Sequence, residues 1–245
     1  MAVTAETSGP MGKTNSGVLI DGSELAATGD GYSFYHSRER RYGSMALTNL
    51  VTDVAKTVAA AYPGSVLQVG DMSGKGGGRI TGHSSHRTGQ DVDLAFFVRN
   101  PQKSDTRDYL LALHDPYGVT VKDGHAAYFD YEKNWAVVEA LLTSDKAQVQ
   151  WIFVSKGLKA RLLAYGLASG RDIDVLNRAA SILHQPKDSA IHNDHFHVRI
   201  FCPPVETAPA CVQGKPVWPW VNNPRKHSQS AVSDDRLYAM ATEDL

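Results

Sequence analysis

Residues 82–93 read GHSSHRTGQDVD and lead into an apolar run. The end of this stretch alternates polar and apolar side chains, which is typical of a β-strand with one buried face. Alternation places Asp91 and Asp93 on one face of a strand over residues 91–98. A carboxylate in such an apolar strand is costly unless its charge is compensated. A divalent cation would compensate it, and His86, seven residues before Asp93, could fold back to share that cation.

Residues 192–200 read HNDHFHVRI. Alternation here places His195 and His197 on one face of a strand and the apolar side chains in the core. The pair of histidines alone is a weak signal. Combined with a histidine seven residues before an aspartate, as in the first stretch, it supplies three nitrogen or oxygen ligands suited to Zn²⁺. Three protein ligands leave a fourth position for water, which is typical of a catalytic rather than a structural zinc site.

The two cysteines allow another arrangement. Cys202 and Cys211 are nine positions apart in a proline-rich stretch, which favours a disulfide-closed loop in an oxidising compartment. In a reducing cytosol they would remain thiols. They could also join His195 and His197 in a closed structural zinc site, although this arrangement leaves the first histidine–aspartate pair unexplained.

Helices and strands alternate along the middle of the chain. Ser44 can cap a helix that ends before a Pro-Gly pair. Apolar spacing predicts further helices over residues 135–142, 158–167 and 175–183, and strands over 65–69, 149–154 and 195–201. These elements predict an α+β fold, in which a central, mainly antiparallel sheet is flanked by helices and carries the metal site.

Composition excludes several classes of protein. The 245 residues are 42% hydrophobic and 21% charged, which is ordinary for a globular chain and excludes disordered and fibrous classes. The net charge of −1 excludes a general nucleic-acid binder. No apolar run approaches the roughly 18 residues of a membrane-spanning helix, so we expect no integral membrane segment.

The two motifs together resemble a known zinc-binding signature. The pattern S-x-H-x-x-G-x₃-D that begins at Ser84, with H-x-H at His195, resembles the zinc signature shared by lysostaphin-type enzymes, D-Ala-D-Ala peptidases and hedgehog domains. The fuller pattern resembles the penicillin-insensitive murein endopeptidases. Supporting segments are GDMS at 70–73 with its glycine run, NW at 134–135 and WIFV at 151–154. The resemblance covers roughly residues 30–205.

The resemblance implies a zinc metallopeptidase that cuts peptide cross-links in bacterial peptidoglycan. The bonds would join D-alanine to meso-diaminopimelate, and sometimes two diaminopimelates. Carried over by motif, His86, Asp93 and His197 would be the zinc ligands, and His195 and His192 the catalytic histidines. The expected cofactor is Zn²⁺, and the expected partners are peptidoglycan stem peptides.

Three further residues belong to the two motifs. His83 matches a family histidine near the metal and is a candidate accessory ligand. Asp194 lies three residues before His197, where related dipeptidases place a general-base glutamate. Strand geometry points Asp194 away from His195 and His197, so its role stays open. Ser84 lacks the sequence context of a serine nucleophile and is expected to donate or accept hydrogen bonds around the site.

Two segments near the site also have alternative readings. The glycine run at residues 74–78 lacks the order of a phosphate-binding loop, and we expect either a wall of the substrate cleft or a plain linker. Arg38, Arg40 and Arg41 could meet the carboxylates of stem peptides, or could form a solvated charged stretch.

We expect an extended N-terminal segment over residues 1–30, a zinc peptidase domain over 31–221 and a C-terminal tail over 222–245. The N-terminus has no basic start and no apolar core, so it is not a secretory signal. A peptidoglycan substrate predicts a periplasmic or secreted protein whose export signal is not present in this chain. The alternative is a cytoplasmic protein.

Two other functions remain open. A D,D- or L,D-carboxypeptidase would use the same chemistry on uncross-linked stems. A zinc-holding cell-wall binding module would have lost catalysis, but retention of both His192 and His195 argues against it, since a binder needs only the ligands.

Overall fold

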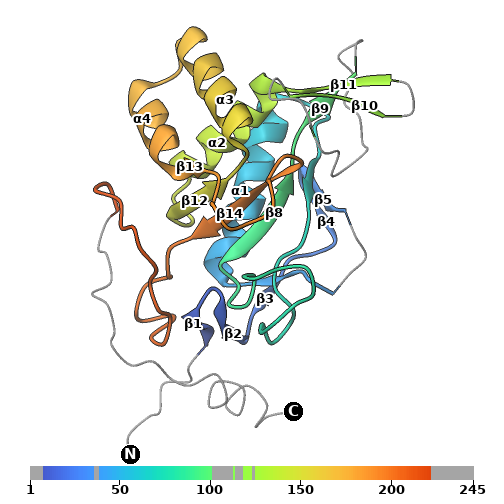
Figure 1. Ribbon diagram of the computed structural model, residues 1–245. Helices are drawn as coiled ribbons and strands as arrows, with labels where there is room; N and C mark the ends of the chain where they lie inside the picture. The colour runs from blue at the N-terminus through green and yellow to red at the C-terminus, as the bar shows by residue number, and fades with distance from the viewer. Residues whose placement is uncertain (1–7, 36–38, 101–112, 114–117, 123–124, 222–245) are drawn as a thin grey trace, which may run out of the picture.

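The computed structural model describes residues 8–35, 39–100, 113, 118–122 and 125–221 (Figure 1). Its elements follow one another along the chain as β1 (Gly9–Lys13), β2 (Ser16–Ile20), β3 (Ser23–Glu24), β4 (Thr28–Gly29), β5 (Tyr32–Phe34), β6 (Tyr42–Gly43), α1 (Met45–Ala61), β7 (Leu67–Val69), β8 (Asp91–Ala95), β9 (Val98–Arg99), β10 (Val119–Lys122), β11 (His125–Phe129), α2 (Tyr131–Thr143), β12 (Val149–Phe153), α3 (Lys156–Ala168), α4 (Ile173–Ile182), β13 (Leu183–His184) and β14 (His195–Ile200).

The central sheet has seven strands in the order β13-β12-β14-β8-β7-β5-β4. The pairs β12–β14, β14–β8, β8–β7 and β5–β4 are antiparallel, and the pairs β12–β13 and β7–β5 are parallel. A separate small sheet, β10-β11-β9, projects to one side (Figure 1). The predicted α+β class and the mainly antiparallel sheet are therefore confirmed.

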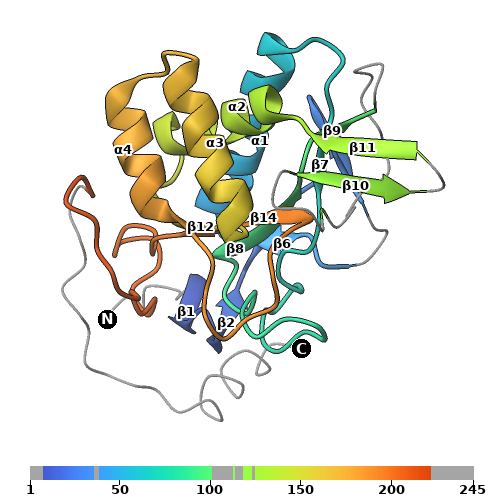
Figure 2. The ribbon, with the colours of Figure 1, turned by 45° about the horizontal axis from the view of Figure 1, so that its top comes forward.

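One face of the central sheet is covered by helices. Side chains from α1, α2, α3 and α4 share a single buried cluster with the apolar side chains of the central strands. Figure 2 shows these helices gathered on the same side of the sheet. The strand side chains in this cluster include Val92, Leu94, Ile152, Phe196 and Val198, all of them fully buried. The opposite face, which carries the alternate residues of the same strands, is left for polar groups.

Local signals placed the helices well. Ser44 caps α1 as predicted, and its hydroxyl accepts a hydrogen bond from the backbone N–H of Leu47. The helices predicted over 135–142 and 158–167 are each longer at both ends. Their N-caps are Asp130 and Ser155, whose side chains accept hydrogen bonds from the first turn of α2 and α3.

The N-terminal segment has strands that the sequence analysis did not predict. Within residues 1–30, the described part contains a hairpin of β1 and β2 and the short strands β3 and β4. The hairpin is held from outside: the N–H of Gly12 donates to the carbonyl of Ala210, and its carbonyl accepts from the N–H of Val212. Tertiary hydrogen bonds therefore stabilise strands that have little apolar alternation of their own. The predicted tail over 222–245 lies outside the described residues.

Cys202 and Cys211 form a disulfide, as predicted. The bonded pair closes the loop that follows β14. The buried Gln90, immediately before β8, contacts this loop: its Nε2 donates to the carbonyl of Ile200 and lies 3.8 Å from Sγ of Cys202. Because both thiols are used, the closed zinc site built from two cysteines and two histidines is excluded.

No helix in the described ranges combines the length and the apolar character needed to cross a membrane.

Asn134 on α2 connects the helical layer to the chain leaving the central sheet. Its side chain is fully buried; the amide donates to the carbonyls of Phe97 and Asp130 at 2.7 and 2.9 Å, and the amide oxygen accepts from the N–H of Phe97 at 3.0 Å. The side chain therefore satisfies both backbone groups of Phe97.

We expect Asn134→Ala to lower the free energy of unfolding by about 1–3 kcal/mol, because the buried N–H of Phe97 would lose its hydrogen-bond partner. Urea denaturation measures this effect. Asn177→Ala, which removes the same amide from an exposed position on α4, is the matched control and should change stability by less than about 0.5 kcal/mol. Equal effects of the two substitutions would contradict this account.

Candidate metal centre on the open face of the sheet

The site is built on the pairing of β8 with β14. In this antiparallel pair His197 lies opposite Asp93, and Arg199 lies opposite Asp91. These residues alternate with the fully buried Val92, Leu94, Phe196 and Val198, which face the helices. The two aspartates and the two motif histidines of β14 therefore lie on the face away from the helices, as the alternation predicted.

The loop between β7 and β8 brings His86 back over this face. His86 has a left-handed backbone, with φ of 63°, a conformation that a non-glycine residue seldom adopts. The buried Ser73 stabilises this bend: its hydroxyl donates to the carbonyl of His86 at 2.7 Å and accepts from the N–H of Gly89 at 2.8 Å. Gly89 itself has φ of 70°, so the tight return before β8 requires glycine.

Asp93 is the centre of the site. Its Oδ1 lies 3.3 Å from Nε2 of His86, 3.5 Å from Nδ1 of His197 and 3.5 Å from Nε2 of His195. His86 is fully buried, and Asp93 and His197 are almost so. Yet Oδ1 of Asp93 and both ring nitrogens of His86 have no hydrogen-bond partner among the described residues.

Buried polar atoms that face one another without hydrogen bonds fit a metal ion. Two groups of donor atoms, each within 4.8 Å of one another, lie here: one is formed by His83, His86 and Asp93, and the other by His192, His195 and His197. The imidazole and carboxylate donors suit a divalent transition metal such as zinc. These residues therefore form a candidate metal centre.

Asp91 orients residues of the centre through hydrogen bonds. The sequence pattern predicted only that it shares a strand face with Asp93. Asp91 is fully buried; its Oδ1 accepts from Nε2 of His197 at 2.9 Å and from Nε of Arg199 at 2.7 Å, and its Oδ2 accepts from the N–H of His86 at 3.4 Å. Hydrogen bonding at Nε2 leaves Nδ1 of His197 as the nitrogen facing Asp93. Carboxylates commonly orient metal-binding histidines in this way.

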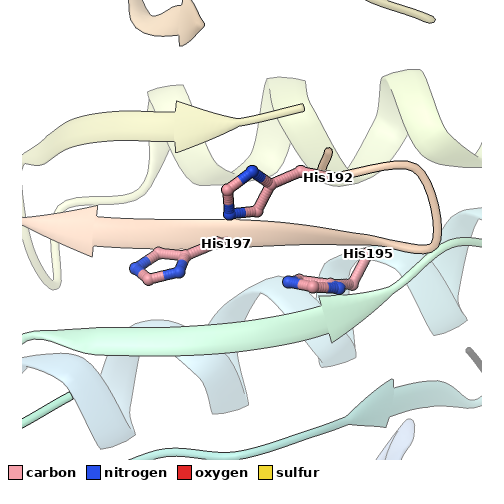
Figure 3. A group of neighbouring side chains, drawn as sticks. All are labelled: His192, His195 and His197. Atoms are coloured by element: carbon pink, nitrogen blue, oxygen red, sulfur yellow. The ribbon is translucent and has the colours of Figure 1, made fainter. Parts of the chain in front are cut away.

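Figure 3 shows the three histidines of the second motif. His195 and His197 extend from β14 on the same side, and His192 comes from the loop before the strand. The ring of His192 lies 5.4 Å from that of His195 and 5.7 Å from that of His197, measured between centroids. Phe153 on β12 packs against the rings of His192 and His197.

The expected orientation of Asp194 is wrong. Alternation pointed it away from His195, but its Oδ1 lies 2.6 Å from Nδ1 of that residue. The reason is that β14 begins at His195, so Asp194 belongs to the preceding loop and does not follow strand alternation. Asp194 therefore holds Nδ1 of His195, while Nε2 faces Asp93.

His83 connects the site to the arginines near β6. Its Nε2 lies 3.0 Å from Asp71 Oδ2, which also accepts from Nη1 of Arg40 at 2.7 Å. Its Nδ1 lies 3.8 Å from Oδ2 of Asp93. Arg41 pairs with Glu24 through Nη2. Arg38 lies outside the described residues.

The glycine run packs against the hairpin of β1 and β2. The N–H of Leu19 on β2 donates to the carbonyl of Gly76, and the N–H of Gly78 donates to the carbonyl of Arg87. A Cβ on Gly77 would collide with the carbonyl oxygen of Arg87, so this crossing of backbones requires glycine.

The carboxylates of the site are ionised in the metal-free protein. Burial favours a neutral Asp93, but the facing His86 and His195 outweigh it and hold the pKa of Asp93 well below its usual range. Burial likewise opposes ionisation of Asp91, but Arg199 is among the partners that hold its pKa far below the usual value. Both carboxylates are thus available as anions.

The histidines of the site divide into two groups by the direction in which the pKa is shifted. Burial disfavours protonation of His86 and His195, but Asp93 outweighs it and raises the pKa of both. Burial lowers the pKa of His197. Burial, with the neighbouring histidines, also lowers the pKa of His192 to about 4. A neutral His192 therefore stands beside a His195 that protonates more readily.

The fold and this site define a class: an α+β protein whose central sheet carries a candidate histidine–aspartate metal centre beside a histidine hydrogen-bonded to a carboxylate. Comparison with known proteins narrows this class. The sequence model of the penicillin-insensitive murein endopeptidases matches residues 10–232. The chain belongs to this family.

The relatives carry the same description. The penicillin-insensitive murein endopeptidase of Haemophilus influenzae is 31% identical over 231 residues, which cover 88% of this chain and 74% of that protein. Those of Klebsiella pneumoniae subsp. pneumoniae and Escherichia coli O157:H7 are 28% and 29% identical, and each alignment covers 79% of this chain and 66% of the relative.

We expect the imidazole of His192 to titrate near pH 4 in the metal-free protein, below its usual 6.5. Nitrogen-15 NMR of the ring measures the midpoint, and the chain unfolded in urea is the control. Because the unfolded chain takes up this proton near pH 6.5 and the folded chain only near 4, this histidine lowers stability as pH falls through that window. A folded-state midpoint above pH 6 would contradict the assignment.

Proposed function

We propose that this protein is a zinc-dependent peptidoglycan endopeptidase that hydrolyses stem-peptide cross-links, between D-alanine and meso-diaminopimelate and also between two diaminopimelates. The proposal rests on one observation: His86, His195 and His197 converge on the buried carboxylate of Asp93, and Oδ1 of that carboxylate has no hydrogen-bond partner among the described residues. Family membership supports the class of substrate.

The proposed ligands are His86, Asp93 and His197. Their donors come from a rigid strand pair and from a loop held by Ser73, so they would be positioned before the metal arrives. A zinc ion bound by them would supply Lewis-acid chemistry toward the attacking water and the scissile carbonyl. His83 lies beside the proposed ligands and contacts Asp71, and it is proposed as an accessory metal ligand.

The proposed catalytic histidines are His195 and His192. Asp194 holds Nδ1 of His195, so Nε2 is the nitrogen that would take the proton of the attacking water and deliver it to the leaving amine. His192, neutral near pH 7, would act on the same proton transfer or bind the developing oxyanion from the other side. Because no covalent step with a serine is needed, β-lactams have no nucleophile to acylate.

The disulfide and the substrate together support a periplasmic or secreted location. A disulfide persists in an oxidising compartment, and peptidoglycan lies outside the cytoplasm.

Digestion of purified peptidoglycan tests the function directly. The chain, with measured zinc content, is incubated with and without a chelator, and the muropeptides are separated by mass. Conversion of dimers to intact monomers, abolished by the chelator and restored by zinc, is the expected result. Loss of a terminal D-alanine from monomers would instead identify a carboxypeptidase. Unchanged muropeptides with zinc bound would identify a binding module.

Removal of any proposed ligand should empty the site. We expect His86→Ala, Asp93→Ala and His197→Ala each to lose stoichiometric zinc and cleavage, because two ligands hold zinc poorly. His184→Ala is the control, since it removes an exposed histidine of the same sheet outside the proposed ligand set. Elemental analysis and the cleavage assay measure both effects. Stoichiometric zinc with normal turnover in Asp93→Ala would overturn the ligand assignment.

Removal of His195 should spare the metal and damage catalysis. We expect His195→Ala to retain zinc and to lose roughly 10²–10⁴ in turnover, the usual contribution of a positioned acid–base group. His192→Ala should also be damaging, and the double variant should lose less than the product of the two effects, because both serve one proton transfer. Loss of zinc from His195→Ala would show that this residue is a ligand instead.

A further inference from the structure

Arg199 lies one step beyond the candidate metal centre on the same face of the sheet. It follows His197 by two residues on β14 and pairs with Asp91, as His197 pairs with Asp93. Two residues of a strand span about 7 Å, so Arg199 lies about two residues' length along β14 from the proposed ligand His197. The arginine side chain is 19% exposed, whereas its partner Asp91 is fully buried.

The guanidinium of Arg199 is fixed by a hydrogen bond from Nε to Asp91 and lies near the aromatic ring of Phe153. Its Nε donates to Oδ1 of Asp91 at 2.7 Å, and its Cζ lies 5.5 Å from the centre of the Phe153 ring. Within the described ranges its two terminal nitrogens have no hydrogen-bond partner. They are also not among the buried atoms that lack a partner there. They are therefore accessible from the open face.

Arg40 and Arg41 are used differently. Arg40 spends Nη1 on Asp71 and the carbonyl of Thr81, and Arg41 spends Nη2 on Glu24. End-on binding of a carboxylate uses both terminal nitrogens of a guanidinium, and in each of these two arginines one of them is already engaged by the protein. Arg199 is fixed through Nε, which orders the side chain and leaves both terminal nitrogens for a ligand.

A preorganised guanidinium is a bidentate receptor for a carboxylate. We propose that Arg199 is a substrate-binding residue that recognises the carboxylate on the carbon bearing the leaving amine of the cross-link. The inference rests on the proposed function, because both proposed cross-links place a free carboxylate on that carbon. The residue would then select cross-links in which this carboxylate is free over those in which it is amidated.

Two synthetic cross-linked peptides test the proposal, one with the free carboxylate beside the leaving amine and one with that group as a primary amide. For the wild-type chain we expect kcat/KM to be about 10- to 100-fold higher for the acid, the range of a charge-assisted pair. Arg199→Gln should bring the ratio of kcat/KM for the acid to kcat/KM for the amide close to one. Arg199→Lys, which keeps the charge without the fork, should retain part of the preference.

Arg161→Gln, at an exposed position on α3, is the matched control and should keep the full preference. Zinc content is measured for each variant, because Asp91 also contacts His197. Equal loss on the acid and the amide in Arg199→Gln that retains its zinc would overturn the proposal and leave a structural role. If Arg199→Gln does not fold or loses zinc, the same comparison is decided by Arg199→Lys.

Binding separates this inference from the proposed function. Calorimetry of the zinc-loaded chain uses the uncross-linked tetrapeptide stem, as the free acid and as the amide at the same carbon. Tighter binding of the acid by wild type, lost in Arg199→Gln, supports the assignment even if neither dimer is cleaved, an outcome that would refute the endopeptidase function alone. Equal affinity for both peptides in the wild type would overturn the proposal.

Discussion

The antiparallel register between β8 and β14 is the constraint on which the site depends. It sets His197 opposite Asp93 and Arg199 opposite Asp91, and both pairs lie on the face that the helices leave open. A shift of β14 by one residue would turn His197 and Arg199 into the apolar core and bring Phe196 and Val198 out. The large buried cluster on the helical face therefore stabilises this register, and with it the geometry of the candidate metal centre.

Buried charge at the centre of the sheet is the cost of this arrangement. Asp91 offsets its own charge through Arg199 and through hydrogen bonds from His197 and the N–H of His86. Asp93 faces His86, His195 and His197, and its Oδ1 has no hydrogen-bond partner in the part of the chain that the structure describes. One carboxylate is thus satisfied by the protein, and the other is left for a cation. The difference divides the two aspartates into a supporting group and a proposed ligand.

Much of this organisation could be predicted from the sequence. The capped helix at Ser44, the alternation in both motif strands and the disulfide all follow from local patterns or spacing. The hairpin of β1 and β2 could not be predicted, because its short strands depend on hydrogen bonds to the disulfide loop some 200 residues later. The orientation of Asp194 was wrongly predicted, because the strand begins one residue after it.

The sequence by itself determined which side chains share a strand face, because side-chain direction alternates along any strand whatever its neighbours. It also determined family membership through the two histidine motifs. Only the tertiary structure decided which side chains meet: that Asp91 holds His197 and Arg199, and that a guanidinium fixed through Nε remains accessible. These contacts join residues more than 100 positions apart, and packing of the whole sheet against its helices sets their register, so no local pattern encodes them.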